Sequence, residues 1–347
     1  MTAARSTKID LSATPYYHCM TRCVRRTFLC GLDSQSGQDY SHRKGWIVGR
    51  MKQLAEVFAI HICAYAIMSN HYHLVLCVDD NAANRWSDDE VFQRWERLFP
   101  NDANQIELLG YSKAEINEKI ALWRQRLTSI SWFMRCLNET IARLSNKEEA
   151  ITGRFWEGRF KSQALLDEGA VLAAMAYVDL NPVRAKAVMA PEDAEFTSIF
   201  ERIKMVAKQL KKKAMTTTSF HMPSFAKQCD ALKQPKSLMA FSNGKSAANE
   251  KPTINFKLSE YLQLIDETGR IIREGKRGAI PQHLTPILNR LHLSASGWME
   301  MVKHLEKNFF HAIGNSMILV DFGKIEHERK PKGYNAAKKY YLKLNDN

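Results

Sequence analysis

A transmembrane helix is indicated by a run of about 18 or more apolar residues, and the sequence has no run that approaches this length. Its first residues, MTAARSTKIDLSATP, contain no apolar stretch of the kind that a secretory signal needs. The seven cysteines form no CxxC pair, and the chain has no GxxxxGK[ST] phosphate-binding loop. The absence of a signal and of CxxC pairs favours a cytoplasmic protein with reduced thiols.

The composition is that of a globular protein with a basic surface. Hydrophobic residues make up 45% of the 347 residues and charged residues 25%, which argues against wholesale disorder. The length favours two domains. The 50 lysines and arginines exceed the 37 aspartates and glutamates, giving a net charge of +13. This excess favours a polyanionic partner, with nucleic acid ahead of an anionic membrane surface.

Three of the cysteines, Cys19, Cys23 and Cys30, lie close together in the sequence. A zinc site is one interpretation of this group. The other is that they are small buried side chains on a strand and its flank, and free cysteine is one of the most buried residue types. The second interpretation is the stronger one, because the spacing lacks a metal-binding signature.

Hydrophobic periodicity predicts the main elements. Residues 60–68 and 71–78 have strand composition on either side of Ser69-Asn70, which predicts an antiparallel hairpin. Apolar residues at helical spacing predict a helix over 129–145, and an alanine-rich helix over 168–180 should end at Asn181-Pro182. The predicted organisation is a domain at 1–210 with a helical insertion at 79–128, a basic polar linker at 211–252, and a helical accessory domain with a basic tail at 253–347.

His71 and His73 form the sharpest local feature, since they are two residues apart on a predicted strand. Alternation places both imidazoles on one face with Cβ atoms about 6–7 Å apart, while Tyr72 points to the other face and packs. Two imidazoles held in this way can chelate one divalent metal ion. The alternative is a histidine pair on a solvated or DNA-facing sheet surface.

Tyr177 and Asn181 form a second feature, because residues four apart share a helix face. The asparagine side-chain oxygen is a suitable ligand for Mg²⁺ or Mn²⁺. A tyrosine beside it could attack phosphorus. The competing interpretation is a core tyrosine followed by an ordinary Asn-Pro helix stop.

The segment RFWEGRFK at 154–161 interleaves basic and aromatic residues within a predicted strand at 154–165. Aromatic side chains can stack on bases and cations can follow phosphates, so the segment is a candidate DNA contact. A half-buried strand with solvated charges is the alternative. The candidate DNA-binding residues, with one from the following helical region, are Arg154, Trp156, Arg159, Lys161 and Arg184.

These three features occur in one order along the chain, and that order is more specific than any one of them. The chain resembles the IS200-like transposase family, in particular the REP-associated tyrosine transposases, which are single-tyrosine HUH nucleases named for a His–hydrophobic–His strand. The resemblance spans about residues 10–200. The insertion at 79–128 is longer than in compact members, and the region beyond 210 is absent from them. The matching stretches are YYHCMTR at 16–22, YAIMSNHYHLVL at 65–76, GRFWEGRFKSQAL at 153–165 and AYVDLNPVRA at 176–185.

The resemblance implies an α+β fold, with a ferredoxin-like antiparallel sheet and packed helices, to which this chain adds a mainly helical C-terminal extension. It implies that His71, His73 and Asn181 bind Mg²⁺ or Mn²⁺ and that Tyr177 is the nucleophile. The implied activity is cleavage and rejoining of single-stranded, hairpin-forming repeat DNA through a 5′-phosphotyrosine. The implied location is the bacterial cytoplasm, at the nucleoid. No membrane partner is implied, and a homodimer is one option.

Two other functions compete with this one. A DNA-binding regulator derived from a transposase would keep the fold and bind DNA without cleaving it. A zinc-dependent hydrolase would use the HxH pair with other ligands and would not need Tyr177. The presence of His71, His73, Tyr177 and Asn181 together favours the enzyme over the regulator.

Overall fold

The structure is a computed structural model, and the parts of the chain that it describes are residues 9–24, 29–33, 37–213, 226–244, 251–274, 280–325 and 331–342. Much of the predicted linker and of the basic tail, namely 214–225, 245–250, 326–330 and 343–347, lies outside these ranges. The predicted domain boundaries stay a prediction. None of the helices in the described ranges is both long enough and apolar enough to cross a membrane.

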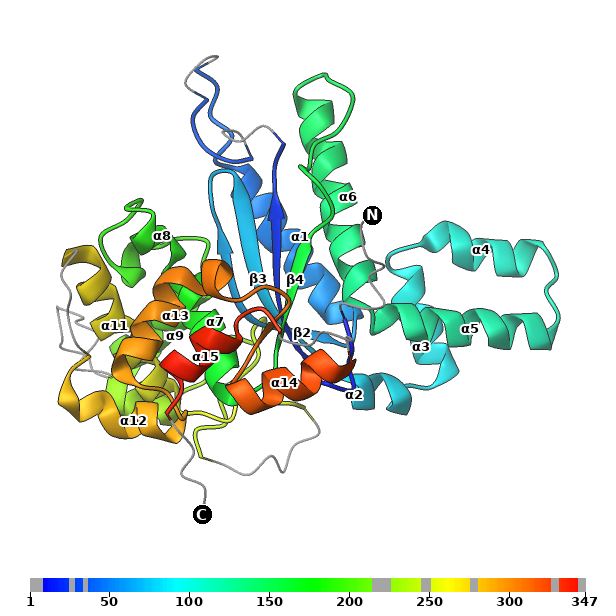
Figure 1. The fold of residues 1–347 in the computed structure, drawn as a ribbon. Coiled ribbons are helices and arrows are strands. Elements are labelled where there is room, and N and C mark those ends of the chain that lie inside the picture. The colour runs from blue at the N-terminus through cyan, green and yellow to red at the C-terminus, as the bar shows by residue number, and fades with distance from the viewer. Residues whose placement is uncertain are drawn as a thin grey trace.

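A five-stranded sheet forms the centre of the molecule (Figure 1), in the order β2-β3-β1-β4-β5. The pairs β2-β3, β3-β1 and β1-β4 are antiparallel, and β5 pairs parallel with β4. The predicted α+β class with an antiparallel sheet is therefore confirmed, with one parallel edge strand added from the C-terminal region. The strands are β1 (Tyr16–Arg22), β2 (Ile60–Ile67), β3 (His71–Val78), β4 (Lys161–Leu165) and β5 (Ala312–Ile313).

Helices cover both faces of the sheet. One face packs on α1 (Arg43–Val57) and α6 (Ile130–Glu148), which also contact each other. Helix α6 begins where the Ser129 side chain accepts a hydrogen bond from the Trp132 N–H, and its buried residues recur at helical spacing. Between β3 and α6 the chain forms four helices that project to one side of the sheet: α2 (Asp80–Arg85), α3 (Asp88–Glu96), α4 (Pro100–Leu108) and α5 (Lys113–Leu127).

The other face packs on α7 (Glu168–Asp179), in which every residue from Gly169 to Asp179 is buried. A helix that is apolar all round must be covered on several sides, and here the C-terminal region supplies the outer cover. The elements after α7 are α8 (Asn181–Arg184), α9 (Ser198–Lys213), α11 (Leu258–Glu274), α12 (Thr285–Arg290), α13 (Ala295–Asn308), α14 (Ser316–Ile325) and α15 (Tyr334–Tyr340), with short 3₁₀ helices η2 (Pro191–Asp193), η3 (Ala226–Ala231) and η4 (Gln282–Leu284).

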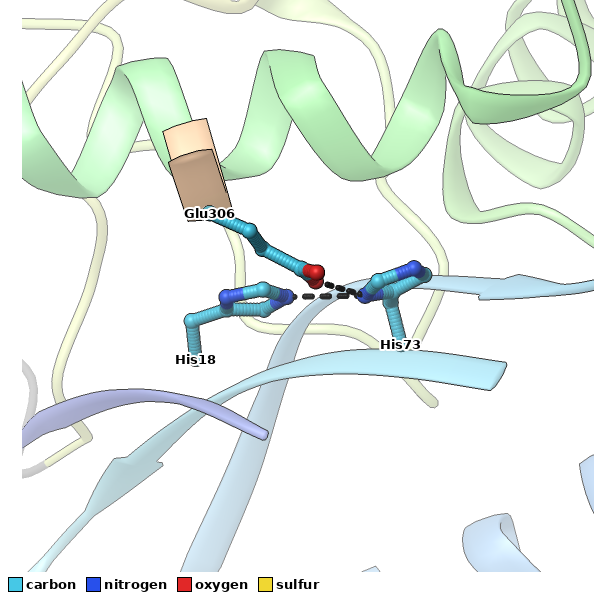
Figure 2. Close-up of side chains that lie close together, drawn as sticks. All are labelled: His18, His73 and Glu306. Atoms are coloured by element: carbon cyan, nitrogen blue, oxygen red, sulfur yellow. Dashed lines mark hydrogen bonds and ion pairs between the residues drawn. The ribbon is translucent and has the colours of Figure 1, made fainter. Parts of the chain in front are cut away.

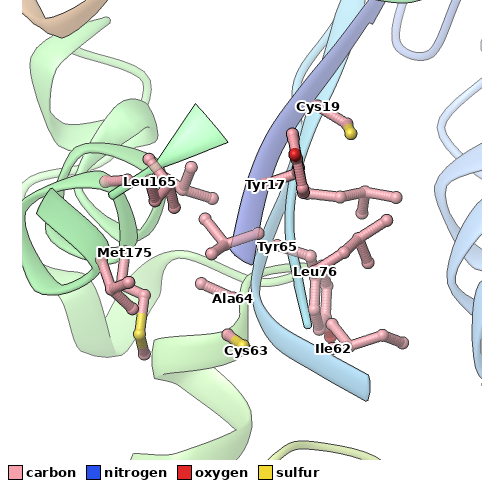
Figure 3. Close-up of a cluster of buried hydrophobic side chains, with 14 of the residues drawn as sticks. Tyr17, Cys19, Ile62, Cys63, Ala64, Tyr65, Leu76, Leu165 and Met175 are labelled. Atoms are coloured by element: carbon pink, nitrogen blue, oxygen red, sulfur yellow. The ribbon is translucent and has the colours of Figure 1, made fainter. Parts of the chain in front are cut away.

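The hydrophobic core runs through the sheet (Figure 3). Tyr17, Tyr65 and Leu76 are fully or almost fully buried between the strands and the helices. Cys19, Cys23 and Cys30 are buried as well, and no disulfide forms among the seven cysteines. The burial of Cys19, Cys23 and Cys30 agrees with their interpretation as small buried side chains.

Candidate functional site

The predicted hairpin places His71 and His73 on one face of the sheet, as alternation required. In the pairing of β1 with β3, Met20 lies opposite His73 and Arg22 lies opposite His71. The two imidazole ring centres are 4.9 Å apart. The same face carries a third histidine, His18 of β1, whose ring stacks on His73 with centres 5.1 Å apart.

Hydrogen bonds fix the protons on His18 and His73. The Gln163 Nε2 group donates to the Phe309 carbonyl at 3.1 Å, which leaves Gln163 Oε1 facing His18 Nδ1 at 2.8 Å. His18 Nδ1 therefore carries the proton, and its Nε2 accepts from His73 Nδ1 at 2.9 Å. It follows that Nε2 of His73 holds the free lone pair. Outer hydrogen bonds of this kind orient the imidazoles of metal sites.

His71 has the same arrangement of protons. Its Nδ1 donates to the side-chain oxygen of Asn70, so its Nε2 is also unprotonated. Burial lowers the pKa of His71 to about 4, and the positive charge of Arg22 acts in the same direction. Burial also lowers the pKa of His18 and of His73. All three imidazoles are therefore neutral at pH 7, which is the form that binds metals.

Glu306 of α13 completes a group that the sequence did not reveal (Figure 2). Ligand atoms of His18, His73 and Glu306 all lie within 4.8 Å of one another. Glu306 Oε1 is buried without a hydrogen-bond partner and lies 3.5 Å from His73 Nδ1. His18 Nε2 and His73 Nδ1 hydrogen-bond each other in this structure, so this group could hold a divalent ion once the proton between them is released.

Tyr177 of α7 packs on these histidines at the face of the sheet that α7 covers. Its ring lies edge-on to His73 and His18, at centre distances of 5.6 and 5.9 Å. Burial raises the pKa of its hydroxyl, while the nearby charge of Arg184 lowers it. The phenol ring therefore lies against the imidazole rings within one chain.

Asn181 lies at the start of α8 and is buried. Its side chain makes no hydrogen bond to His71 or His73. Arg184, one helical turn further on, stacks its guanidinium 3.7 Å above the Tyr177 ring and donates to the main chain of α13. Arg184 therefore holds the Tyr177 ring and α13 together within the site.

The other candidate DNA contacts lie at the start of β4. Arg154, Arg159 and Lys161 are exposed. Trp156 is only 9% exposed, because its ring packs on Tyr72 and its Nε1 donates to the Asn138 carbonyl at 2.9 Å. In this arrangement the Trp156 ring is not presented to a base.

The predicted strand over 154–165 is wrong in its first half. Only Lys161–Leu165 is a strand, and Trp156 forms a single isolated bridge with Cys23. Gly153 at φ 108° turns the chain into an irregular segment. The consecutive residues Phe155 and Trp156 of that segment are both buried, so its side chains do not alternate between a buried and an exposed side as those of a strand would.

Comparisons with known proteins add one weak similarity. No family model matches the chain, and no curated protein matches it significantly. A solved structure described as the REP-associated tyrosine transposase bound to a REP hairpin is similar with a TM-score of 0.36 and 13% identity. The similar region covers 63% of this chain and 95% of that one.

Proposed function

We propose that this protein is a metal-dependent endonuclease and strand transferase that acts on single-stranded, hairpin-forming DNA through a 5′-phosphotyrosine at Tyr177. The observation that carries the proposal is the meeting of Tyr177 with neutral, oriented histidines on one face of the sheet. The order of the sequence motifs supports it independently. The basic charge of the chain suits a DNA substrate at the bacterial nucleoid.

In the proposed reaction the Tyr177 oxygen forms a bond to the scissile phosphorus. The bond from phosphorus to the 3′ oxygen breaks, the phenol proton passes to water, and the 3′ oxygen takes up a proton. The phosphodiester energy is kept in the tyrosine ester, so the reverse attack by a 3′ hydroxyl rejoins a strand without ATP. Arg184 stabilises the phenolate by its charge over the ring.

We assign His71, His73 and Asn181 as the residues that would hold Mg²⁺ or Mn²⁺, with Glu306 beside His73 as a further oxygen ligand. The ion would supply charge stabilisation at the phosphate when bound. His18 and Gln163 keep the Nε2 lone pair of His73 free for that role. A homodimer stays a prediction.

The test is a covalent-adduct assay. Purified protein, a 5′-flanked hairpin oligonucleotide and Mn²⁺ should give a denaturation-resistant protein–DNA species. Tyr177→Phe should abolish this species and retain hairpin affinity, because the ring that packs on the histidines remains. Tyr65→Phe is the matched control for loss of a buried hydroxyl, and it should keep the adduct.

Two outcomes would contradict the proposal. Tight hairpin binding with no adduct in either metal would favour the non-cleaving regulator. Cleavage that survives Tyr177→Phe and follows bound zinc would favour the hydrolase.

A further inference from the structure

A groove of about 1190 Å³ lies away from the histidines, between α1, α9, the start of β2 and the segment 233–239. His61 and Ile62 at its floor pair with Cys77 and Leu76 at the end of β3, whereas the metal-site histidines lie at the start of that strand. Six lysines line this lysine groove: Lys52, Lys204, Lys208, Lys212, Lys233 and Lys236.

The positive charge of the groove is mostly uncompensated. The two acidic residues of the groove already form ion pairs. Glu201 pairs with Lys52, and Glu56 pairs with Arg97 at 3.3 Å. The five remaining lysines form no ion pair with a carboxylate of the described chain. All five are exposed to solvent. Unpaired cations on two facing walls favour an anionic ligand that enters between them.

One wall presents its charges in a row. Lys204, Lys208 and Lys212 follow one another at four-residue intervals on α9, so they share a face and rise by about 6 Å at each step. Like charges at this spacing repel each other, and the isolated helix gains nothing from them. A repeating anion, such as a phosphodiester chain, relieves the repulsion along the whole row.

The opposite wall is held in place by hydrogen bonds. The Gln209 side chain donates to the Lys233 carbonyl at 2.7 Å and accepts from the Lys233 N–H at 2.9 Å. Buried Arg202 donates to the Met239 carbonyl, and the Met239 N–H donates to the Ile62 carbonyl at 2.8 Å. The groove is therefore formed before any ligand arrives, which lowers the entropy cost of binding.

Apart from His61 the floor is apolar, with Ala55, Ile62, Met205 and Leu238 between the charged walls. Apolar surface beside cations suits a single strand, whose bases are open on one side while its phosphates contact lysines. A duplex would present only phosphates to this floor and would leave it uncovered.

We infer that the lysine groove binds the backbone of single-stranded DNA without base specificity. The inference rests on the proposed function in that it assigns the groove to the strand flanking the hairpin. It adds an attachment site that needs neither the metal nor Tyr177.

The test measures binding in EDTA, where no cleavage step is involved, so it stands or fails separately from the adduct assay. The probe is a fluorescent oligothymidylate, and its anisotropy is recorded over a range of salt concentrations. Lys208→Gln with Lys212→Gln removes two of the three charges in the row on α9, and Lys233→Gln with Lys236→Gln removes both lysines of the opposite wall. Lys113→Gln with Lys339→Gln is the control, since both residues are exposed on helices outside the groove.

Each groove variant should bind the probe about tenfold more weakly, and its slope of log affinity against log salt should fall by about 1.4, the value for two lost single-strand contacts. The control should change affinity less than about twofold. Equal losses in all three variants would show a general charge effect and overturn the inference, as would unchanged binding in the groove variants. The wall at 233–236 lies outside any helix, so it separates charge loss from helix damage.

Discussion

The guanidinium carbon of Arg184 lies 3.7 Å from the centre of the Tyr177 ring, and its Nη1 donates to the carbonyls of Val302 and Lys303 at 3.3 and 2.9 Å. One side chain thus places a positive charge over the phenol and joins α8 to α13. The C-terminal region is in this way part of the environment of the tyrosine.

Arg184→Met should slow adduct formation, because it removes the positive charge that lowers the pKa of the Tyr177 hydroxyl and so reduces the phenolate fraction. The methionine keeps an unbranched stem against the ring, so the packing loss is small. The measurement is the initial rate of adduct formation with saturating hairpin. Arg154→Met, which alters an exposed arginine, should change hairpin affinity and leave the saturated rate intact. Equal rates for Arg184→Met and wild type would contradict the role given to Arg184.

Glu306→Gln should weaken Mn²⁺ binding by about 10- to 100-fold, the usual effect of losing a group that ligates or orients a metal-binding histidine. The substitution keeps the shape of the side chain and removes its charge. Isothermal titration calorimetry with Mn²⁺ and no DNA measures the effect directly. Glu300→Gln on the same helix is the control.

Asn181→Ala in the same titration distinguishes the two oxygen ligands. If only Asn181→Ala weakens Mn²⁺ binding, the carboxylate of Glu306 has no part in the metal site. If both variants bind Mn²⁺ as wild type does, the assignment of this metal site is wrong.

Asp167→Asn should change how stability depends on pH. Asp167 caps α7 and accepts from the Ala170 N–H, the Asn315 N–H and the Tyr341 hydroxyl. Burial nevertheless raises the pKa of its carboxyl above the ordinary value. A carboxyl with a raised folded-state pKa binds its proton more tightly in the folded state, so it costs stability as pH rises from about 4 through the raised value.

The wild-type unfolding free energy, measured by urea denaturation, should therefore fall relative to that of Asp167→Asn as pH rises from about 4 to about 7. The altered hydrogen bonds of Asp167→Asn lower its unfolding free energy by the same amount at every pH. Asp39→Asn is the control of opposite sign, because hydrogen bonds from Ser41 lower the pKa of that exposed carboxyl. Parallel curves for wild type and Asp167→Asn would refute the prediction.

Local patterns in the sequence were enough to predict the hairpin of β2 and β3 and the shared face of His71 and His73. Both follow from the two-residue period of a strand, which needs no information about distant residues. The end of α7 near Asn181-Pro182 was predictable for the same reason. The predicted strand at 154–165 failed because Phe155 and Trp156 fill the core from irregular backbone.

The participation of His18 and Glu306 could not be predicted, because it depends on long-range pairing. His18 reaches His73 only through the register of β1 with β3, and Glu306 comes from a helix near the end of the chain. The one signal in the sequence was the position of His18 inside YYHCMTR, a stretch already singled out by resemblance. No local rule indicates which distant carboxylate will approach a histidine pair.

All seven cysteines lie in the interior, and burial raises the pKa of Cys30 and Cys77 to about 12. Since the thiolate is the reactive form, these native thiols resist alkylation while the protein is folded. An exposed thiol introduced by Lys208→Cys would react with a maleimide dye far faster than they do. A fluorophore could thus be attached to the wild-type background at one chosen position, and it would report strand occupancy in real time.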